Sequence, residues 1–126
     1  MESTNQKVIL VIDDEEDIRG LLQSFFNDLG YRTLVAADLN QTVFILNREE
    51  PDIVFLDIVL PGVNGIEILK LLKRLNPALI VVMMSGYATE AKARAALDLG
   101  AFDYMNKPFD MEHVRNMLNM INKSIL

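Results

Sequence analysis

The sequence predicts an α/β fold in which five strand–helix units, (βα)5, form one doubly wound domain around a parallel sheet. Short apolar runs rich in valine and isoleucine alternate along the chain with longer segments of helical period. These runs lack the polar–apolar alternation of a half-exposed strand, which indicates strands buried on both faces. At 126 residues, with 51% hydrophobic content and a mean hydropathy of +0.20, the chain can bury one core.

The first two units are read from apolar spacing and from the residues that stop a helix. Lys7–Ile12 is a near-continuous apolar strand, and the helix that follows ends at Gly30. Arg32–Ala36 is a weaker strand, and the helix at Leu39–Asn47 ends before Pro51. The side chains expected on one face of the first helix are Ile18, Leu21, Leu22, Phe25 and Leu29. Those with helical spacing in the second helix are Val43 and Leu46.

The last three units follow the same rules. In order, they are strand Ile53–Leu56, helix Ile66–Leu75, strand Leu79–Met83, helix Ala88–Leu99, strand Phe102–Met105 and a helix from Asp110 onward. The turn formers in the first connection, expected to be a loop, are Pro61, Gly62, Asn64 and Gly65. Gly100 ends the alanine-rich helix. The apolar positions of the last helix are Val114, Met117, Leu118, Ile121 and Ile125.

Charge and composition exclude several classes of function. The chain has 12 Lys plus Arg and 18 Asp plus Glu, a formal net charge of −6 and a pI near 4.7. We therefore expect no direct binding of nucleic acid, because its phosphates need a basic surface. The chain has no cysteine and one histidine, which excludes thiolate and histidine-cluster metal sites and most Ser-His or Cys-His catalysis. The remaining chemistry is that of carboxylates.

The amino-terminal segment shows no targeting signal. Residues 1–6 are expected to be a flexible tail, and the apolar run Val8–Ile12 has no basic segment before it and is too short for a signal core. Polar residues interrupt every apolar stretch before it reaches the roughly 18 residues that a membrane span needs. We expect a cytoplasmic protein without membrane association.

Charged and hydroxyl side chains follow four of the five predicted strands. Asp13 and Asp14 follow the first strand, Asp57 the third, Ser85 the fourth and Lys107 the fifth. In a flavodoxin-like sheet of order 2-1-3-4-5, the first and third strands are neighbours about 4.8 Å apart, and ligands bind outside the carboxyl ends. Lys107 starts roughly 10 Å from Asp57, a gap that a lysine stem can span. These side chains are therefore expected to converge.

The expected cluster needs positive charge. Like charges at 4 Å repel by about 4 kcal/mol at an effective dielectric constant of 20. Lys107 offsets part of this repulsion, and a hard cation with oxygen ligands offsets more, which points to Mg²⁺ as the cofactor. A carboxylate beside such an ion, with a hydroxyl and an ammonium near it, is suited to be the nucleophile in phosphoryl transfer. Asp57 is centrally placed for this role.

Four stretches of the chain carry a resemblance to a known family. The sequence resembles the receiver domain of bacterial two-component response regulators, and the resemblance covers almost all of residues 1–126 as one domain. The matching stretches are Val8–Glu15, Leu56–Gly65, Met84–Ala88 and Gly100–Phe109. Jointly they are highly specific. A receiver of this kind is either free-standing or the amino-terminal part of a longer regulator.

The resemblance implies a signalling chemistry at the predicted cluster. It implies that Asp57 accepts a phosphoryl group from a sensor histidine kinase or a histidine phosphotransfer protein. It also implies that Asp14, Asp57 and the Val59 carbonyl bind Mg²⁺, with Asp13 supporting the metal through water. Such a phosphoacceptor is not an enzyme acting on other substrates, although it assists its own phosphorylation and dephosphorylation.

The resemblance also implies a switch and two partner surfaces. Ser85 and Lys107 hold the phosphoryl oxygens, Ser85 and Tyr104 change position, and the Lys107–Pro108 bond is cis. The signal reaches a downstream domain or partner, or a homodimer, through Ala88–Leu99, the fifth strand and the last helix. The kinase is expected to dock on the first helix, near Ile18 and Leu22, and on the loop at Pro108–Phe109.

Two positions are expected to set the lifetime of the phosphoryl group. Val59 lies two residues after Asp57, and Tyr87 lies two residues after Ser85; both flank the path of a hydrolytic water in similar domains. Neither side chain orients water as a carboxylate or amide does, and the bulk of Tyr87 shields the site. We expect slow self-dephosphorylation.

Three other functions fit the pattern less well. A flavin-binding module of the same sheet order would place its phosphate after the first strand, where the acidic run at residues 13–17 repels it. An aspartyl phosphatase resembling the haloacid dehalogenase group has a second acid at the position of Val59. A phosphorylation-independent pseudo-receiver, acting as a docking scaffold, stays as the alternative, although the complete set of Asp13, Asp14, Asp57, Ser85 and Lys107 argues against it.

Overall fold

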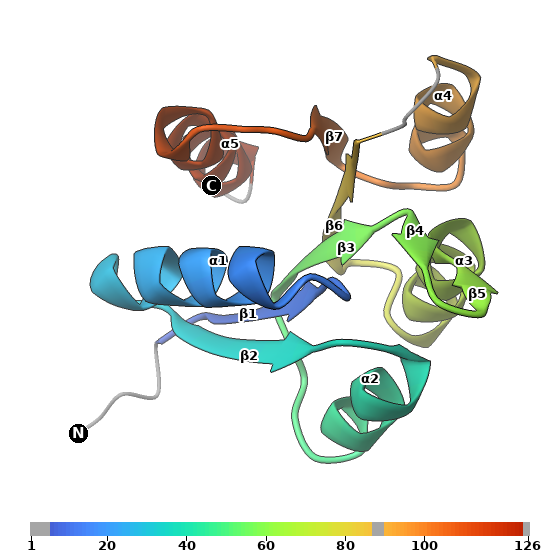
Figure 1. Cartoon of the computed structure of the whole chain (residues 1–126), viewed down its shortest axis with the longest axis horizontal. Helices are drawn as coiled ribbons and strands as arrows, with labels where there is room; N and C mark the ends of the chain where they lie inside the picture. Colours follow the sequence, from blue (N-terminus) through green and yellow to red (C-terminus); the bar gives the residue numbers. More distant parts are fainter. Residues whose placement is uncertain (1–5, 87–89, 125–126) are drawn as a thin grey trace.

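A computed structural model describes residues 6–86 and 90–124 and confirms the predicted α/β architecture (Figure 1). Five strands form one parallel sheet in the order β2-β1-β3-β6-β7, which is the predicted order 2-1-3-4-5. The sheet strands are β1 (Val8–Ile12), β2 (Arg32–Ala36), β3 (Ile53–Asp57), β6 (Ile80–Ser85) and β7 (Asp103–Asn106). The helices are α1 (Glu16–Asp28), α2 (Leu39–Leu46), α3 (Gly65–Leu75), α4 (Glu90–Asp98) and α5 (Met111–Ser124).

Two hydrophobic layers cover the two faces of the sheet. Helices α1 and α5 lie on one face, and α2, α3 and α4 lie on the other (Figure 1). Alternate residues of each strand enter different layers: Ile9 and Val11 pack toward α1 and α5, whereas Leu10 and Ile12 pack toward α2, α3 and α4. The central strands are thus buried on both faces, as their unbroken apolar runs predicted.

The strand register brings distant segments together at the carboxyl edge of the sheet. Asp57 pairs with Met84, and Ser85 pairs with Asn106, the residue before Lys107. The ladder continues past the strands, because the Ile58 N–H donates to the Met84 carbonyl at 2.9 Å. The positions of the carboxyl-end residues are therefore fixed by backbone pairing.

Helix ends follow local sequence signals. Asp38 Oδ1 accepts a hydrogen bond from the Gln41 N–H at the start of α2, and Asn64 Oδ1 accepts one from the Ile66 N–H at the start of α3. After α1 and α4 the chain turns at Gly30 and Gly100, whose φ angles are 96° and 101°. Both predicted helix stops are confirmed, because this left-handed backbone favours glycine.

Two predicted helix faces are wrong at some positions. In α1 and its C-cap the predicted Leu21 and Leu29 are 47% and 37% exposed, and the buried side chains are Leu22 and Phe26. In α2 the predicted Val43 is 42% exposed, whereas Thr42 is buried and its hydroxyl donates to the Asp38 carbonyl. The reason is the same in both helices: several adjacent residues are apolar, so hydrophobicity alone does not fix the angle at which the helix meets the sheet.

The predicted loop between β3 and α3 contains a short hairpin. Strands β4 (Val59–Leu60) and β5 (Val63–Asn64) pair antiparallel across the turn formers Pro61 and Gly62. Strands β3 and β6 run further than predicted, through Asp57 and Ser85. Several predicted features lie outside the described residues. They are the expected tail at residues 1–6 apart from Gln6, Tyr87, the start of the helix predicted from Ala88, and Ile125.

A search of the described residues for membrane spans finds no helix whose length and apolarity would let it cross a bilayer.

Gly65, the first residue of α3, packs directly against the backbone that carries Asp57. A Cβ atom at position 65 would lie 2.4 Å from the Asp57 carbonyl oxygen and 2.7 Å from Ile58 Cα. We expect Gly65→Ala to lower the free energy of unfolding by roughly 1–3 kcal/mol, because backbone atoms cannot move aside as a flexible side chain can. Urea unfolding followed by circular dichroism measures this change.

Gly20, in the middle of α1, is the matched control. A Cβ atom there would meet no atom within 4 Å. Gly20→Ala should raise the free energy of unfolding by about 0.5–1 kcal/mol, because alanine favours the helix. Equal effects of the two substitutions would show that the close approach at Gly65 does not constrain the chain.

Candidate functional site

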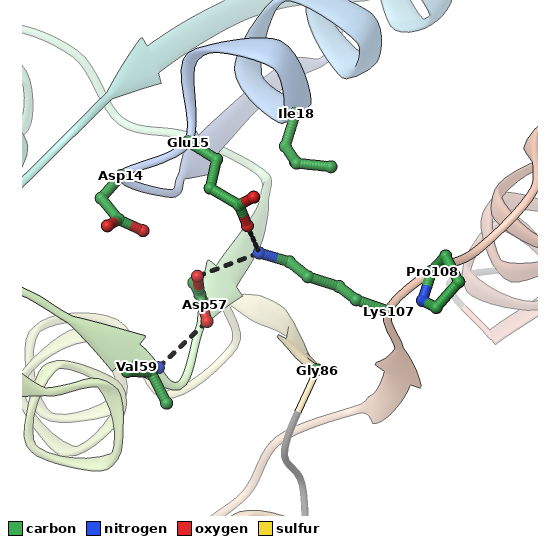
Figure 2. A pocket seen from close by; sticks show the side chains of 8 residues that line it. All are labelled: Asp14, Glu15, Ile18, Asp57, Val59, Gly86, Lys107 and Pro108. Atoms are coloured by element: carbon green, nitrogen blue, oxygen red, sulfur yellow. Dashed lines mark hydrogen bonds and ion pairs between the residues drawn. The ribbon is translucent and has the colours of Figure 1, made fainter.

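An open pocket of about 580 Å³ lies at the carboxyl edge of the sheet, where β1, β3, β6 and β7 end. Its walls come from four separate stretches of chain, which converge in Figure 2. The lining residues are Asp14, Glu15, Ile18, Asp57, Val59, Gly86, Lys107 and Pro108. Four predicted site residues, Asp14, Asp57, Val59 and Lys107, therefore meet at one pocket.

The ammonium group of Lys107 forms the centre of this site. Lys107 Nζ lies 2.7 Å from Asp13 Oδ2, 2.8 Å from Glu15 Oε1 and 3.0 Å from Asp57 Oδ2. Its side chain is 12% exposed and reaches across from the end of β7 (Figure 2). One cation thus joins three carboxylates that belong to two other strand ends.

Asp57 is held through both of its carboxylate oxygens. Oδ2 accepts a hydrogen bond from Lys107 Nζ, and Oδ1 accepts one from the Val59 N–H at 3.0 Å. The residue is 4% exposed, yet it lines the open pocket, so its carboxylate is fixed in place and faces the cavity. The Val59 side chain is 52% exposed beside it.

Asp13 and Asp14 follow β1 but differ in environment. Asp13 is fully buried; its backbone N–H donates to the Ala36 carbonyl, and its Oδ1 accepts from the Glu15 N–H at 2.9 Å. Asp14 is exposed on the pocket wall. Each of Asp13, Asp14 and Asp57 offers a carboxylate oxygen within 4.8 Å of the others. A group of oxygen ligands this close together fits a hard divalent cation.

The pKa values of Asp13 and Lys107 are both raised, but for different reasons. Burial raises the pKa of Asp13 above its ordinary value, and the nearby charge of Asp57 adds to this; hydrogen bonds from Lys107 and Glu15 only partly oppose it. Burial also acts to lower the pKa of Lys107, but its hydrogen bonds with Asp13, Glu15 and Asp57 outweigh burial and raise that pKa. The ammonium therefore stays charged throughout the physiological range.

Ser85 and Tyr104 lie near the site without lining the pocket. Ser85 is 2% exposed at the end of β6, and its carbonyl accepts a hydrogen bond from the Lys107 N–H at 2.9 Å. Tyr104 is partly buried in β7 and packs against the hydrophobic layer of α2, α3 and α4. The predicted Tyr87 lies outside the described residues.

The structure adds one site residue and corrects one prediction. Glu15 was not predicted to take part, although it directly follows the paired aspartates and so carries a carboxylate to the pocket mouth. Leu22 was expected to contribute to kinase docking, but it lies on the buried face of α1 and cannot offer its side chain to a partner. Ile18 and Pro108, from the same expected surface, do line the pocket. The Lys107–Pro108 bond is cis, as expected.

Comparison with known families and curated proteins gives a consistent result. The family described as response regulator receiver domain matches residues 9–119. Sporulation initiation phosphotransferase F of Bacillus subtilis is 40% identical over 112 residues, which cover 89% of this chain and 90% of that protein. The nitrogen assimilation regulatory protein NtrX of Azorhizobium caulinodans is 38% identical over 108 residues, which cover 84% of this chain but only 24% of that protein.

Solved structures show the same similarity. The receiver domain of NtrX from Brucella abortus is 37% identical with a TM-score of 0.83, covering 89% of this chain and 95% of that chain. A response regulator from Burkholderia pseudomallei, crystallised with a phosphorylated aspartic acid, a calcium ion and citrate, is 28% identical with a TM-score of 0.80. That match covers 86% of this chain and 64% of the other.

The raised pKa of Asp13 predicts a gain in stability when its charge is removed. We expect Asp13→Asn to raise the free energy of unfolding at pH 7 in the presence of a chelator, because the buried ionised carboxylate costs energy that a neutral amide avoids. The size of the gain depends on how far the folded structure raises this pKa, since each pH unit corresponds to about 1.4 kcal/mol. Urea unfolding measures it.

The pH dependence of this gain provides the control. As the pH falls through the raised pKa toward the ordinary value of 3.8, the folded wild type takes up a proton at Asp13 and its cost disappears. The stability difference between Asp13→Asn and wild type should therefore shrink in acid. A variant less stable than wild type at pH 7 would show that the ion pair with Lys107 outweighs the cost of burial.

Proposed function

We propose, from the premise that this chain belongs to the response regulator receiver domain family, that Asp57 accepts a phosphoryl group from a phosphohistidine of a sensor histidine kinase or a histidine phosphotransfer protein. The observation that carries this proposal is the geometry of Asp57: its carboxylate is held by the Val59 N–H and the Lys107 ammonium and faces an open pocket. A similar response regulator carries a phosphorylated aspartic acid, which supports the same chemistry here.

The proposed reaction is a direct transfer between two side chains. An oxygen of Asp57 forms a bond to phosphorus while the bond between phosphorus and the donor imidazole nitrogen breaks, and the imidazole leaves with the electron pair. Lys107, and the hydroxyl of Ser85, would donate hydrogen bonds to the phosphoryl oxygens. The product is a mixed anhydride on Asp57, whose hydrolysis resets the protein.

The carboxylates beside Asp57 are suited to a divalent cation, and we assign Mg²⁺ as the cofactor. Asp14, Asp57 and the Val59 carbonyl would hold the ion directly, with Asp13 supporting it through water. When bound, the ion supplies positive charge that neutralises the phosphoryl oxygens and the carboxylates. The close set of three aspartates supports this assignment, and a similar regulator was crystallised with a calcium ion.

The proposed output is a change of surface and not turnover of a substrate. Ser85 moving toward the phosphoryl group would open space for Tyr104 and alter the surface of α4, β7 and α5. Tyr104 already packs against the hydrophobic layer that contains Ala96 of α4, which supports such coupling. The receiver, acting in the cytoplasm, would signal to a downstream domain, a protein partner or a second copy. Because the site groups converge, the geometry does not favour the pseudo-receiver alternative.

Substitution of the proposed acceptor tests the function directly. Incubation with acetyl phosphate and Mg²⁺ should add the mass of one phosphoryl group to the wild type, detected by intact mass spectrometry, and none to Asp57→Asn. Asp28→Asn, at an exposed aspartate of α1, is the control and should behave as wild type. A mass gain that persists in Asp57→Asn would move the acceptor to another residue.

The Val59 side chain, exposed beside Asp57, is proposed to slow loss of the phosphoryl group. Val59→Asn should shorten the lifetime roughly two- to tenfold, because an amide can orient water but cannot provide the roughly 10²–10⁴-fold of a general base. The lifetime is followed by intact mass after removal of acetyl phosphate. Val59→Ala separates bulk from polarity: a lifetime as short as that of Val59→Asn would show that access alone controls the rate.

A further inference from the structure

We propose that Glu15 is a positioning residue that occupies the ammonium of Lys107 in the unphosphorylated protein and gives up this place to a phosphoryl oxygen. The inference rests on the proposed function of Asp57 and adds a role for a side chain outside the predicted set. Figure 2 shows the Glu15 carboxylate directed from the start of α1 toward Lys107, with Asp57 on the other side of the ammonium. Glu15 therefore contacts the group that must turn to the phosphoryl oxygens.

The number of N–H donors on Lys107 limits how many oxygens the ammonium can bind at once. A lysine ammonium has three N–H donors, and Nζ has three carboxylate neighbours, Asp13, Glu15 and Asp57, at 2.7, 2.8 and 3.0 Å. The contacts with Glu15 and Asp57 are hydrogen bonds and the contact with Asp13 is a close ion pair, so an incoming phosphoryl oxygen must compete with three carboxylates for one ammonium. One of these carboxylates must withdraw if Lys107 is to hold the phosphoryl group.

Burial decides which carboxylate withdraws. The Asp13 side chain is 0% exposed, so losing Lys107 would leave a buried charge without its cation, which is strongly unfavourable. Asp57 is covalently attached to the phosphoryl group and stays in place. The Glu15 side chain is 58% exposed and can return to water, and exposed ion pairs are worth little. Glu15 is the partner that is released at the lowest cost.

The backbone of Glu15 is fixed, so displacement requires only rotation of its side chain. Its N–H donates to Asp13 Oδ1 at 2.9 Å, and its carbonyl accepts from the Arg19 N–H at 3.1 Å in the first turn of α1. Glu15 is the N-cap residue of α1, but its side chain makes no capping hydrogen bond. The carboxylate is thus committed to Lys107 and not to the helix, and helix α1 does not depend on it.

Competition for Lys107 predicts the effect of removing the carboxylate. Beryllofluoride, a mimic of a phosphoryl group on an aspartate, should bind Glu15→Gln roughly two- to fivefold more tightly than wild type, the size expected for an exposed ion pair. Isothermal titration calorimetry in saturating Mg²⁺ measures the dissociation constant. Glu16→Gln is the matched control, because Glu16 is exposed in the same acidic run and does not line the pocket. It removes an equal charge and should bind within about 1.5-fold of wild type.

A spectroscopic measurement tests displacement itself. In protein labelled with ¹³C at glutamate carboxylates, the Glu15 resonance is identified by its absence from Glu15→Gln. Addition of beryllofluoride with Mg²⁺ should move this resonance toward that of Glu16, as expected for a carboxylate released to water. A side chain that only stabilised the loop would keep its resonance position.

The outcomes separate this inference from the proposed function. If the wild type binds no beryllofluoride, the proposed function of Asp57 fails. If the wild type binds it but Glu15→Gln binds equally or more weakly, or no more tightly than Glu16→Gln, the role of Glu15 is refuted. A Glu15 resonance that stays unchanged in the bound wild type refutes it as well.

Discussion

The ion-pair cluster around Lys107 is the interaction on which the site depends. Asp13 follows β1, Asp57 ends β3 and Lys107 follows β7, so 50 residues separate Lys107 from Asp57 and 92 separate it from Glu15. Without the ammonium, two carboxylates with little exposure would repel each other in a medium of low polarity. The strand order β1-β3-β6-β7 is what allows one lysine to reach both. The charge balance of the pocket therefore depends on the topology of the sheet.

The elements around the cluster hold its residues in place. Gly65 lets α3 begin against the backbone of Asp57, and the Val59 N–H fixes one carboxylate oxygen of Asp57. On the other side, the Arg19 guanidinium donates to the Asp13 carbonyl at 2.9 Å and ties α1 to the end of β1. The two sides of the pocket are thus attached to different helices.

Much of this arrangement could be predicted from the sequence, because strand order and strand ends follow from patterns that one chain displays. The apolar runs located all five sheet strands, and the residues after them located Asp13, Asp14, Asp57 and Lys107 in one place. The hairpin of β4 and β5 was missed, because Pro61 and Gly62 mark a turn but two-residue strands carry no period. The apolar period also could not distinguish Leu21 from Phe26.

The ion pair between Glu15 and Lys107 shows why side-chain pairing could not be predicted from the sequence. An acidic residue at the start of a helix is favoured by the helix dipole and is usually solvated, so the run at residues 13–17 reads equally well as a helix start. Glu16 and Asp17 fit that reading, since both lie in the first turn of α1. Only the distance from Glu15 Oε1 to Lys107 Nζ separates Glu15 from its neighbours. That distance depends on how far the lysine stem extends, which no pattern in the sequence encodes.

The formal charge of the pocket explains why its two proposed ligands depend on each other. Asp13, Asp14, Glu15 and Asp57 contribute −4 and Lys107 contributes +1, a sum of −3. A phosphoryl dianion on Asp57 replaces one negative charge by about two, which makes the sum about −4 and opposes the transfer. A dication held by the aspartates brings the same product to about −2, and release of Glu15 to water removes one more charge from contact with Lys107. Metal binding and withdrawal of Glu15 therefore act in the same direction. Each lowers the electrostatic cost of placing a phosphoryl dianion on Asp57.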